Sequence, residues 1–322
     1  MRRIAALLLS VFIALPAAAQ ELYPSHPITL ISPYPPGGAT DFLARTLAEG
    51  LKTRLAQTVL VQNVGGAGGT VGSLQAAKAK PDGYTLLLHH IGMSTIPALY
   101  KKLAFDPLAA FEFVGVFAEA PMMILARRDF APGNFAELVA YAKANGEKFT
   151  VASAGMGSVT HLCAMLFQEA LGMPLTVVQY KGGGPAVIDV RSGQVDIICD
   201  LPTTNSGAIR SGDLKAYVLT APQRMATLPD VPTAAEVGMP SLAIGVWFGL
   251  YAPHGTPRPV IDTLNKALRD IVADKAVAAQ LEKIETVLLP LDQVTPEAHR
   301  KKLASQIELW GPIIEKAGIQ AE

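Results

Sequence analysis

The sequence has no net charge and almost no cysteine, and both shortages exclude classes of function. Its 322 residues contain 27 Lys and Arg against 27 Asp and Glu, so the formal net charge is zero. A chain without a basic excess has no bulk electrostatic attraction for nucleic acid or for an anionic membrane surface. The two cysteines, Cys163 and Cys199, lack a matching histidine spacing and therefore make a poor zinc site.

Glycine is abundant, but no glycine-rich segment matches a nucleotide-binding fingerprint. Residues 63–72 invite a dinucleotide interpretation, yet the spacing that begins with Gly66 and Gly68 requires glycine where Val71 stands. No GxxxxGK[ST] phosphate loop occurs anywhere in the chain. We therefore interpret residues 63–72 as a flexible loop and expect no cofactor.

The N-terminus has the pattern of a secretory signal peptide. Arg2 and Arg3 precede an almost wholly apolar run, residues 4–15, and the alanines at 17–19 suit cleavage. The run is shorter than the roughly 20 residues that a membrane-spanning helix needs. No cysteine follows the cleavage site, so a lipid anchor is not expected. We predict that residues 1–19 are a signal peptide and that the mature protein is periplasmic.

Short apolar runs alternate with longer helical patterns along the rest of the chain. Residues 28–31 are typical of a strand, and residues 41–51, with leucines at four-residue spacing, of a helix. The same alternation starts again with a strand at 149–153 and a helix at 161–170. Such alternation indicates right-handed βαβ units and a mostly parallel sheet. The sequence thus predicts an α/β fold with two Rossmann-like units.

Two extended segments, near residues 122 and 245, are expected to cross between these units. We predict that lobe 1 comprises residues 20–121 and 246–322, and that lobe 2, residues 122–245, is inserted into it. Two lobes joined by two crossing strands form a hinge, and a hinge creates a cleft.

Two glycine-rich loops, each between a strand and a helix, are candidates for ligand binding. Their residues are Pro36, Gly37, Gly38, Ala39, Thr40 and Asp41 in the first loop, and Ala154, Gly155, Met156, Gly157 and Ser158 in the second. Glycine lets the backbone approach a ligand closely, and a helix start presents unpaired N–H groups at the positive end of its dipole. Neither loop contains Lys or Arg, so an anion there would be held by N–H groups and hydroxyls.

Two other positions are expected near the cleft. His89 and His90 end a predicted strand at its mouth, and we take His90 as the ligand candidate. The pair lacks the i, i+4 spacing and the acidic neighbours of a metal site. Trp247 lies on the returning strand and is expected near the hinge or cleft, although its apolar neighbours Val246 and Phe248 fit a core position equally well.

The two cysteines are predicted to form a disulfide. An exported chain folds in an oxidising compartment, where disulfides form and persist. Cys163 begins a predicted helix just after the second loop, and Cys199 ends a predicted strand that should lie beside it. Two buried free thiols are the alternative.

A serine esterase using the same cleft is the alternative from a different class of function. Residues 151–155 resemble a nucleophile elbow around Ser153 but lack its first glycine. His161 and Asp200 could serve as its partners, but no oxyanion loop of the usual kind is present. We therefore do not expect an enzyme.

Six motifs, in this order along the chain, match one family. They are PPGGATD (residues 35–41), PDGYTLL (81–87), YKGGGPA (180–186), GQVD (193–196), LPDVPT (228–233) and APHGTP (252–257). From about residue 25 to the C-terminus, the chain resembles the extracytoplasmic receptors of tripartite tricarboxylate transporters, often called Bug proteins. The resemblance implies the fold of type II periplasmic binding proteins, with two lobes and a cleft between them.

The same resemblance implies a ligand, partners and site residues. Members of the family bind small carboxylates, such as di- and tricarboxylates, acidic amino acids and aromatic acids, for a membrane permease of large and small subunits. It implies that the loops at 37–41 and 154–158 clamp a ligand carboxylate, partly through water, and that Asp200 lines the pocket. We expect a monomer. A receptor for a sensor kinase, rather than for a transporter, is the alternative.

Overall fold

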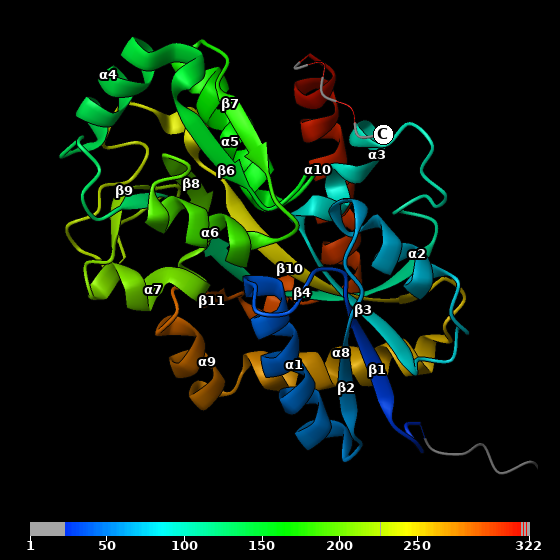
Figure 1. Ribbon diagram of the computed structural model, residues 1–322. Coiled ribbons are helices and arrows are strands. Elements are labelled where there is room, and N and C mark those ends of the chain that lie inside the picture. Colours follow the sequence, from blue (N-terminus) through cyan, green and yellow to red (C-terminus); the bar gives the residue numbers. More distant parts are fainter. Residues whose placement is uncertain (1–22, 226, 317, 319, 321–322) are drawn as a thin grey trace, which may run out of the picture.

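Two β-sheets, each flanked by helices, form the two lobes of the protein (Figure 1). The structure, a computed structural model, describes residues 23–225, 227–316, 318 and 320. The predicted signal peptide, residues 1–19, lies outside the described residues. No helix in the described part of the chain is long and apolar enough to cross a membrane.

The larger lobe is built on a six-stranded sheet with the order β11-β4-β10-β3-β1-β2. Its strands are β1 (Ile28–Ser32), β2 (Val59–Asn63), β3 (Thr85–His90), β4 (Phe111–Pro121), β10 (Gly245–Pro253) and β11 (Val287–Leu288). β1 pairs in parallel with β2 and β3, whereas the other neighbours are antiparallel. The prediction of a mostly parallel sheet is wrong here, because β10 returns from the other lobe, lies between β3 and β4, and runs against both.

Helices cover this sheet by burying apolar stripes. They are α1 (Ala39–Leu55), α2 (Thr70–Ala77), α3 (Ile96–Leu99), α8 (Arg258–Val272), α9 (Lys275–Glu282) and α10 (Pro296–Lys316). In α8, Ile261, Leu264 and Leu268 are buried at three- and four-residue spacing, as the helical period requires. α8 and α10 both pack against β4, and α1 packs against α8.

The smaller lobe is built on a five-stranded sheet with the order β7-β6-β8-β5-β9. Its strands are β5 (Met123–Arg127), β6 (Thr150–Ser153), β7 (Thr176–Gln179), β8 (Ile197–Asp200) and β9 (Leu214–Leu219). Its helices are α4 (Phe135–Asn145), α5 (Val159–Leu171), α6 (Gly183–Ser192) and α7 (Pro202–Arg210). β6 is parallel to β7 and β8, and β5 is antiparallel to β8 and β9, so this sheet is mixed as well.

The chain passes between the sheets at two adjacent points. β4 leads directly into β5, and β10 follows the long segment after β9, with Gly245 paired to Pro121. The Thr220 hydroxyl ties the two crossings together, since it accepts from the Met122 N–H and donates to the Ile244 carbonyl, each at 2.7 Å. The two crossings are therefore tied together by hydrogen bonds at Thr220, and the lobe boundaries at residues 122 and 246 stay a prediction.

The core of the larger lobe contains a histidine whose imidazole ring makes no hydrogen bond among the described residues. His299 of α10 is fully buried against the rings of Phe113, Trp247 and Tyr251. Neither of its ring nitrogens has a partner among the residues that the structure describes. Burial, with a smaller effect of Lys302, lowers the pKa of His299 from 6.5 to about 3. The ring is therefore neutral in the folded protein near neutral pH.

We expect the free energy of unfolding to fall as the pH drops from 6.5 towards about 3, because only the unfolded chain then binds a proton at this histidine. Above that window both states are neutral there, and the contribution vanishes. In a His299→Phe variant, the number of protons that the chain takes up on unfolding in this pH range should be smaller by about one, so the free energy of unfolding should depend less on pH. Urea unfolding at a series of pH values measures both curves, and His254→Gln, an exposed position, is the control. An unchanged curve for His299→Phe would contradict the expectation.

Candidate functional site

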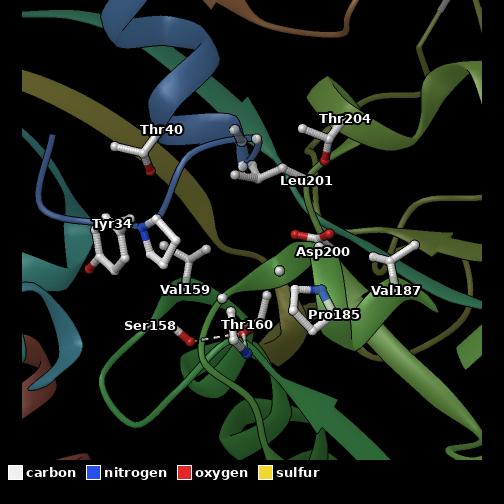
Figure 2. A pocket seen from close by; sticks show the side chains of 18 of the residues that line it. Tyr34, Thr40, Ser158, Val159, Thr160, Pro185, Val187, Asp200, Leu201 and Thr204 are labelled. Atoms are coloured by element: carbon white, nitrogen blue, oxygen red, sulfur yellow. Dashed lines mark hydrogen bonds between the residues drawn. The ribbon is translucent and has the colours of Figure 1, made fainter. Parts of the chain in front are cut away.

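A cavity of about 330 Å³ lies between the two lobes and is lined by both. Residues 34–40 and His90 line it from the larger lobe. The smaller lobe contributes Ala154 and residues 158–160, 181–185, 187–188, 200–201 and 204–205. In Figure 2, Tyr34 and Thr40 lie on one side of this space and Asp200 and Thr204 on the other. Both predicted loops therefore reach the same cavity.

Four helices begin at the wall of this cavity. The first residues of α1 come from the larger lobe, and those of α5, α6 and α7 from the smaller lobe. The first turn of a helix leaves N–H groups without an acceptor inside the helix, and the helix dipole adds partial positive charge there. Because these helices start at one cavity, it offers many N–H donors to a negative group and suits an anion.

The first predicted loop is shaped by a carboxylate that does not line the cavity. Asp41 is 5% exposed and accepts hydrogen bonds from the Gly37 N–H at 3.0 Å, from Asn63 and from Arg45. Burial alone would raise the pKa of Asp41, but the bonds from Arg45, Gly37 and Asn63 together hold it below its usual range. Asp41 thus positions the loop. Pro36, Gly37, Gly38, Ala39 and Thr40 line the cavity itself.

The second predicted loop uses much of its hydrogen-bonding capacity internally. The Ser158 hydroxyl caps α5 by accepting from the His161 N–H, and the Ala154 N–H donates to the Thr160 hydroxyl at 2.6 Å. The Gly157 N–H donates to Nδ1 of His161, whose pKa burial lowers to about 4. Ala154 and Ser158 line the cavity, whereas Gly155, Met156 and Gly157 are not among its lining residues.

His90 lines the cavity, and a hydrogen bond fixes the tautomer of its ring. Its Nδ1 accepts a hydrogen bond from the Gly92 N–H at 2.9 Å, so the neutral ring carries its hydrogen on Nε2. Burial, followed by the neighbouring His89, lowers the pKa of His90 well below its usual value. The ring is stacked on Tyr34, with the ring centroids 4.6 Å apart. A neutral imidazole held in this way can donate one hydrogen bond without adding charge.

Asp200 places a carboxylate in the same wall. It ends β8, is 7% exposed and lines the cavity, and its Oδ2 accepts from Nδ2 of Asn205 at 2.9 Å. Burial raises the pKa of Asp200 to about 6, although the bonds from Asn205 and the Leu201 backbone act against this shift. An anionic ligand that enters the cavity must therefore bind close to the carboxyl group of Asp200.

The starts of α6 and α7 were not identified as part of the site by the sequence analysis. Gly183 and Gly184 in α6, and Thr204 and Asn205 in α7, all line the cavity. Two signals were available: the glycine-rich motif at 181–184 after a strand, and Pro202 in the first turn of a helix. The exposed Lys181, beside the start of α6, also lines the cavity.

Trp247 lies in the core and not in the cavity wall. It is 1% exposed, belongs to β10 and packs against His299, with the ring centroids 5.9 Å apart. It is not among the lining residues. Trp247 is therefore not a cavity residue, but it lies close to the crossings, as the hinge part of the prediction expected, because it is two residues from the Gly245–Pro121 pair.

The disulfide is confirmed, whereas no hydrogen bond joins Ser153 to a histidine among the described residues. Cys163 and Cys199 are bonded, with 5.9 Å between their Cα atoms, and link α5 to β8. The Ser153 hydroxyl contacts the Gly155 carbonyl and the Ser158 hydroxyl, and no histidine of the described residues bonds to it.

Comparisons with known proteins agree with this architecture. The family model described as "Tripartite tricarboxylate transporter family receptor" matches residues 43–319. An Agrobacterium vitis protein, described as "UPF0065 protein in the TAR-I ttuE-ttuC' intergenic region", is 41% identical over 98% of this chain and 92% of its own length.

Two solved structures are similar over nearly the whole fold. The periplasmic binding protein BugD is 42% identical, with a TM-score of 0.89 over 93% of this chain and 100% of that one. MatC from Rhodopseudomonas palustris, solved with bound malate, is 34% identical, with a TM-score of 0.86 over 91% of this chain and 100% of that one.

Proposed function

The chain belongs to the tripartite tricarboxylate transporter receptor family, and from that premise we propose that its interlobe cavity captures a small organic carboxylate. The convergence of four helix N-termini on one cavity carries this proposal, because backbone N–H groups at helix starts are suited to anions. Malate bound to the similar MatC is consistent with a ligand of this class.

The strength of such a site follows from its donors. A hydrogen bond to a charged acceptor contributes about 1.5–3 kcal/mol, and a helix start adds about 0.3–1 kcal/mol for a negative group. Micromolar affinity requires about 8 kcal/mol net. Several N–H donors, the Thr40 hydroxyl and Nε2 of His90 can supply this once the lobes exclude water. No buried cationic side chain is needed.

Capture is only the first step of the proposed role. We propose that the receptor acts in the periplasm as a monomer and delivers its ligand to a membrane permease of separate large and small subunits. The two crossings, which hydrogen bonds tie together at Thr220, are the points about which we expect the lobes to rotate, so that ligand binding between the lobes would cause them to close.

A thermal-shift screen of carboxylic acids, followed by titration calorimetry, tests the proposal. A bound acid at about a hundred times its Kd adds about 2.7 kcal/mol to the folded state, so the unfolding temperature should rise by several degrees. The corresponding neutral amides, which lack the charge, should give no shift.

Affinity for the acid should change by no more than about threefold between low and physiological salt, because the exposed Lys181 is the only cationic side chain that lines the cavity in the described part of the chain. A screen in which no acid binds would overturn the proposal. A steep salt dependence would refute the neutral, backbone-based clamp.

A further inference from the structure

Among the described residues, Asp200 is the one acidic residue that lines the cavity, and no ion pair includes it. Its Oδ2 is held by Asn205, which is itself 3% exposed and bonded to the Leu201 carbonyl. Figure 2 shows the Asp200 carboxylate directed into the space between Pro185 and Thr204. The carboxylate is thus held by Asn205 and faces the cavity.

A carboxylate in this position conflicts with part of the proposed ligand class. Two carboxylates that share a poorly hydrated site repel each other, so both cannot stay ionised without a cost. The second carboxylate of an unsubstituted dicarboxylate would therefore be repelled by Asp200 and would weaken binding. An ammonium or a hydroxyl would instead donate a charge-assisted hydrogen bond to it.

Resting on the proposed function, we propose that Asp200 makes the receptor selective for carboxylates that also carry a hydrogen-bond donor, an ammonium or hydroxyl group. The helix starts and His90 hold the ligand carboxylate, and Asp200 accepts from the donor. The preferred ligands are then amino or hydroxy acids. Simple diacids are disfavoured by the same residue.

None of the other titratable groups around Asp200 can account for the proposed preference for ligands that carry a donor. In the lining these are Tyr34, whose hydroxyl donates to the Gly68 carbonyl, the neutral His90, and the exposed Lys181. The elements packed around β8 carry further groups that do not line the cavity: Arg127 in β5, His161 and Glu169 in α5, Asp189 and Arg191 in α6, and Arg210 in α7.

The selectivity should depend on pH. Burial raises the pKa of Asp200 to about 6, and a second carboxylate beside it would raise that value further. A simple diacid should therefore bind with uptake of close to one proton by Asp200. A ligand with a donor should bind to the ionised form without that uptake, so the preference shrinks as the pH falls below 6.

Calorimetry with L-malate and succinate, which differ by one hydroxyl, is the first test. Near neutral pH, L-malate should bind at least about tenfold more tightly than succinate, since only the L-malate hydroxyl can donate a hydrogen bond to the charged Asp200. L-aspartate against succinate repeats the comparison with an ammonium. Titration in two buffers of different ionisation enthalpy should show proton uptake for succinate alone.

The Asp200→Asn variant is the second test. An amide has nearly the same shape, can still accept from Asn205, and offers an N–H to a second carboxylate. It should bind succinate more tightly than the wild type does, without proton uptake, and reduce the preference for L-malate to within about threefold. Asp213→Asn, which removes the same charge at the surface of the same lobe, should keep the wild-type preference.

The outcomes separate this inference from the proposed function. If neither these acids nor any other carboxylate binds, the proposed function fails, and the selectivity fails with it. If carboxylates bind but L-malate and L-aspartate show no advantage over succinate, only the role of Asp200 is overturned. An advantage that persists unchanged in Asp200→Asn would overturn that role as well.

Discussion

A Gly38→Val variant should lose carboxylate binding by about a hundredfold or more while its unfolding temperature falls by no more than a few degrees, because valine is a poorer N-cap than glycine. Gly38 is the N-cap of α1, with φ −89° and ψ 172°, an extended conformation that valine adopts readily. A Cβ atom there would meet nothing within 4 Å, so the added methyl groups occupy cavity space. They would keep a carboxylate from the N–H groups of α1, and two such bonds account for this loss.

Two other glycines provide the comparison for this variant. Gly311→Val, in α10 and also without a neighbour within 4 Å, controls for the substitution itself and should bind normally. Gly157→Val should instead destabilise the fold, because Gly157 has φ +79° and a Cβ there would lie 3.0 Å from Leu99. Calorimetry and thermal unfolding of the three variants measure both effects. Wild-type affinity in Gly38→Val would refute the clamp at α1.

Replacing both cysteines by alanine should reduce the free energy of unfolding by about 4 kcal/mol, the chain-entropy value for a loop of this length. The disulfide spans 36 residues and joins α5 to β8, and both cysteines are buried. α5 begins at the second loop, and β8 ends at Asp200, so the bond also fixes two walls of the cavity relative to each other.

Urea unfolding of the wild type and of the Cys163→Ala/Cys199→Ala variant measures this loss. The wild type unfolded in the presence of a thiol reductant should approach the variant, whereas without reductant it should keep its full stability. Thiol counting on denatured, unreduced protein should find no free thiol. A loss below about 1 kcal/mol, far under the entropic value, would contradict the expected contribution.

The sequence predicted the parts of the site that depend on local chemistry. Paired glycines after a strand and before a helix, as at Gly37 and Gly38, indicate a turn of the backbone whose N–H groups are not hydrogen-bonded within the helix. The same reasoning located Ala154 and Ser158, and the strand–helix alternation gave the two α/β units. These features follow from neighbours within a few residues along the chain.

The parts that failed depend on contacts between distant segments. Asp41 was expected in the binding site, but its bonds to Asn63 and Arg45 direct it into the loop instead. Strand β4 was not predicted, and the direction of β10 follows from its return out of the other lobe. For Trp247 the sequence could not decide between the core and the cleft, because its partner His299 lies on a helix 52 positions further along the chain.

The insertion of one lobe into the other also has a consequence for how the chain folds. All five strands of the smaller sheet lie in one continuous stretch, between Met123 and Leu219, and none of its pairings encloses another lobe. The larger sheet must bring Phe248 beside His90, and that pairing closes a loop containing the whole smaller lobe. Contacts of such large sequence separation form slowly, because the entropy of closing the loop must be lost before the contact stabilises anything. The larger lobe is therefore the last to be completed, and until then the cavity lacks one of its two sides.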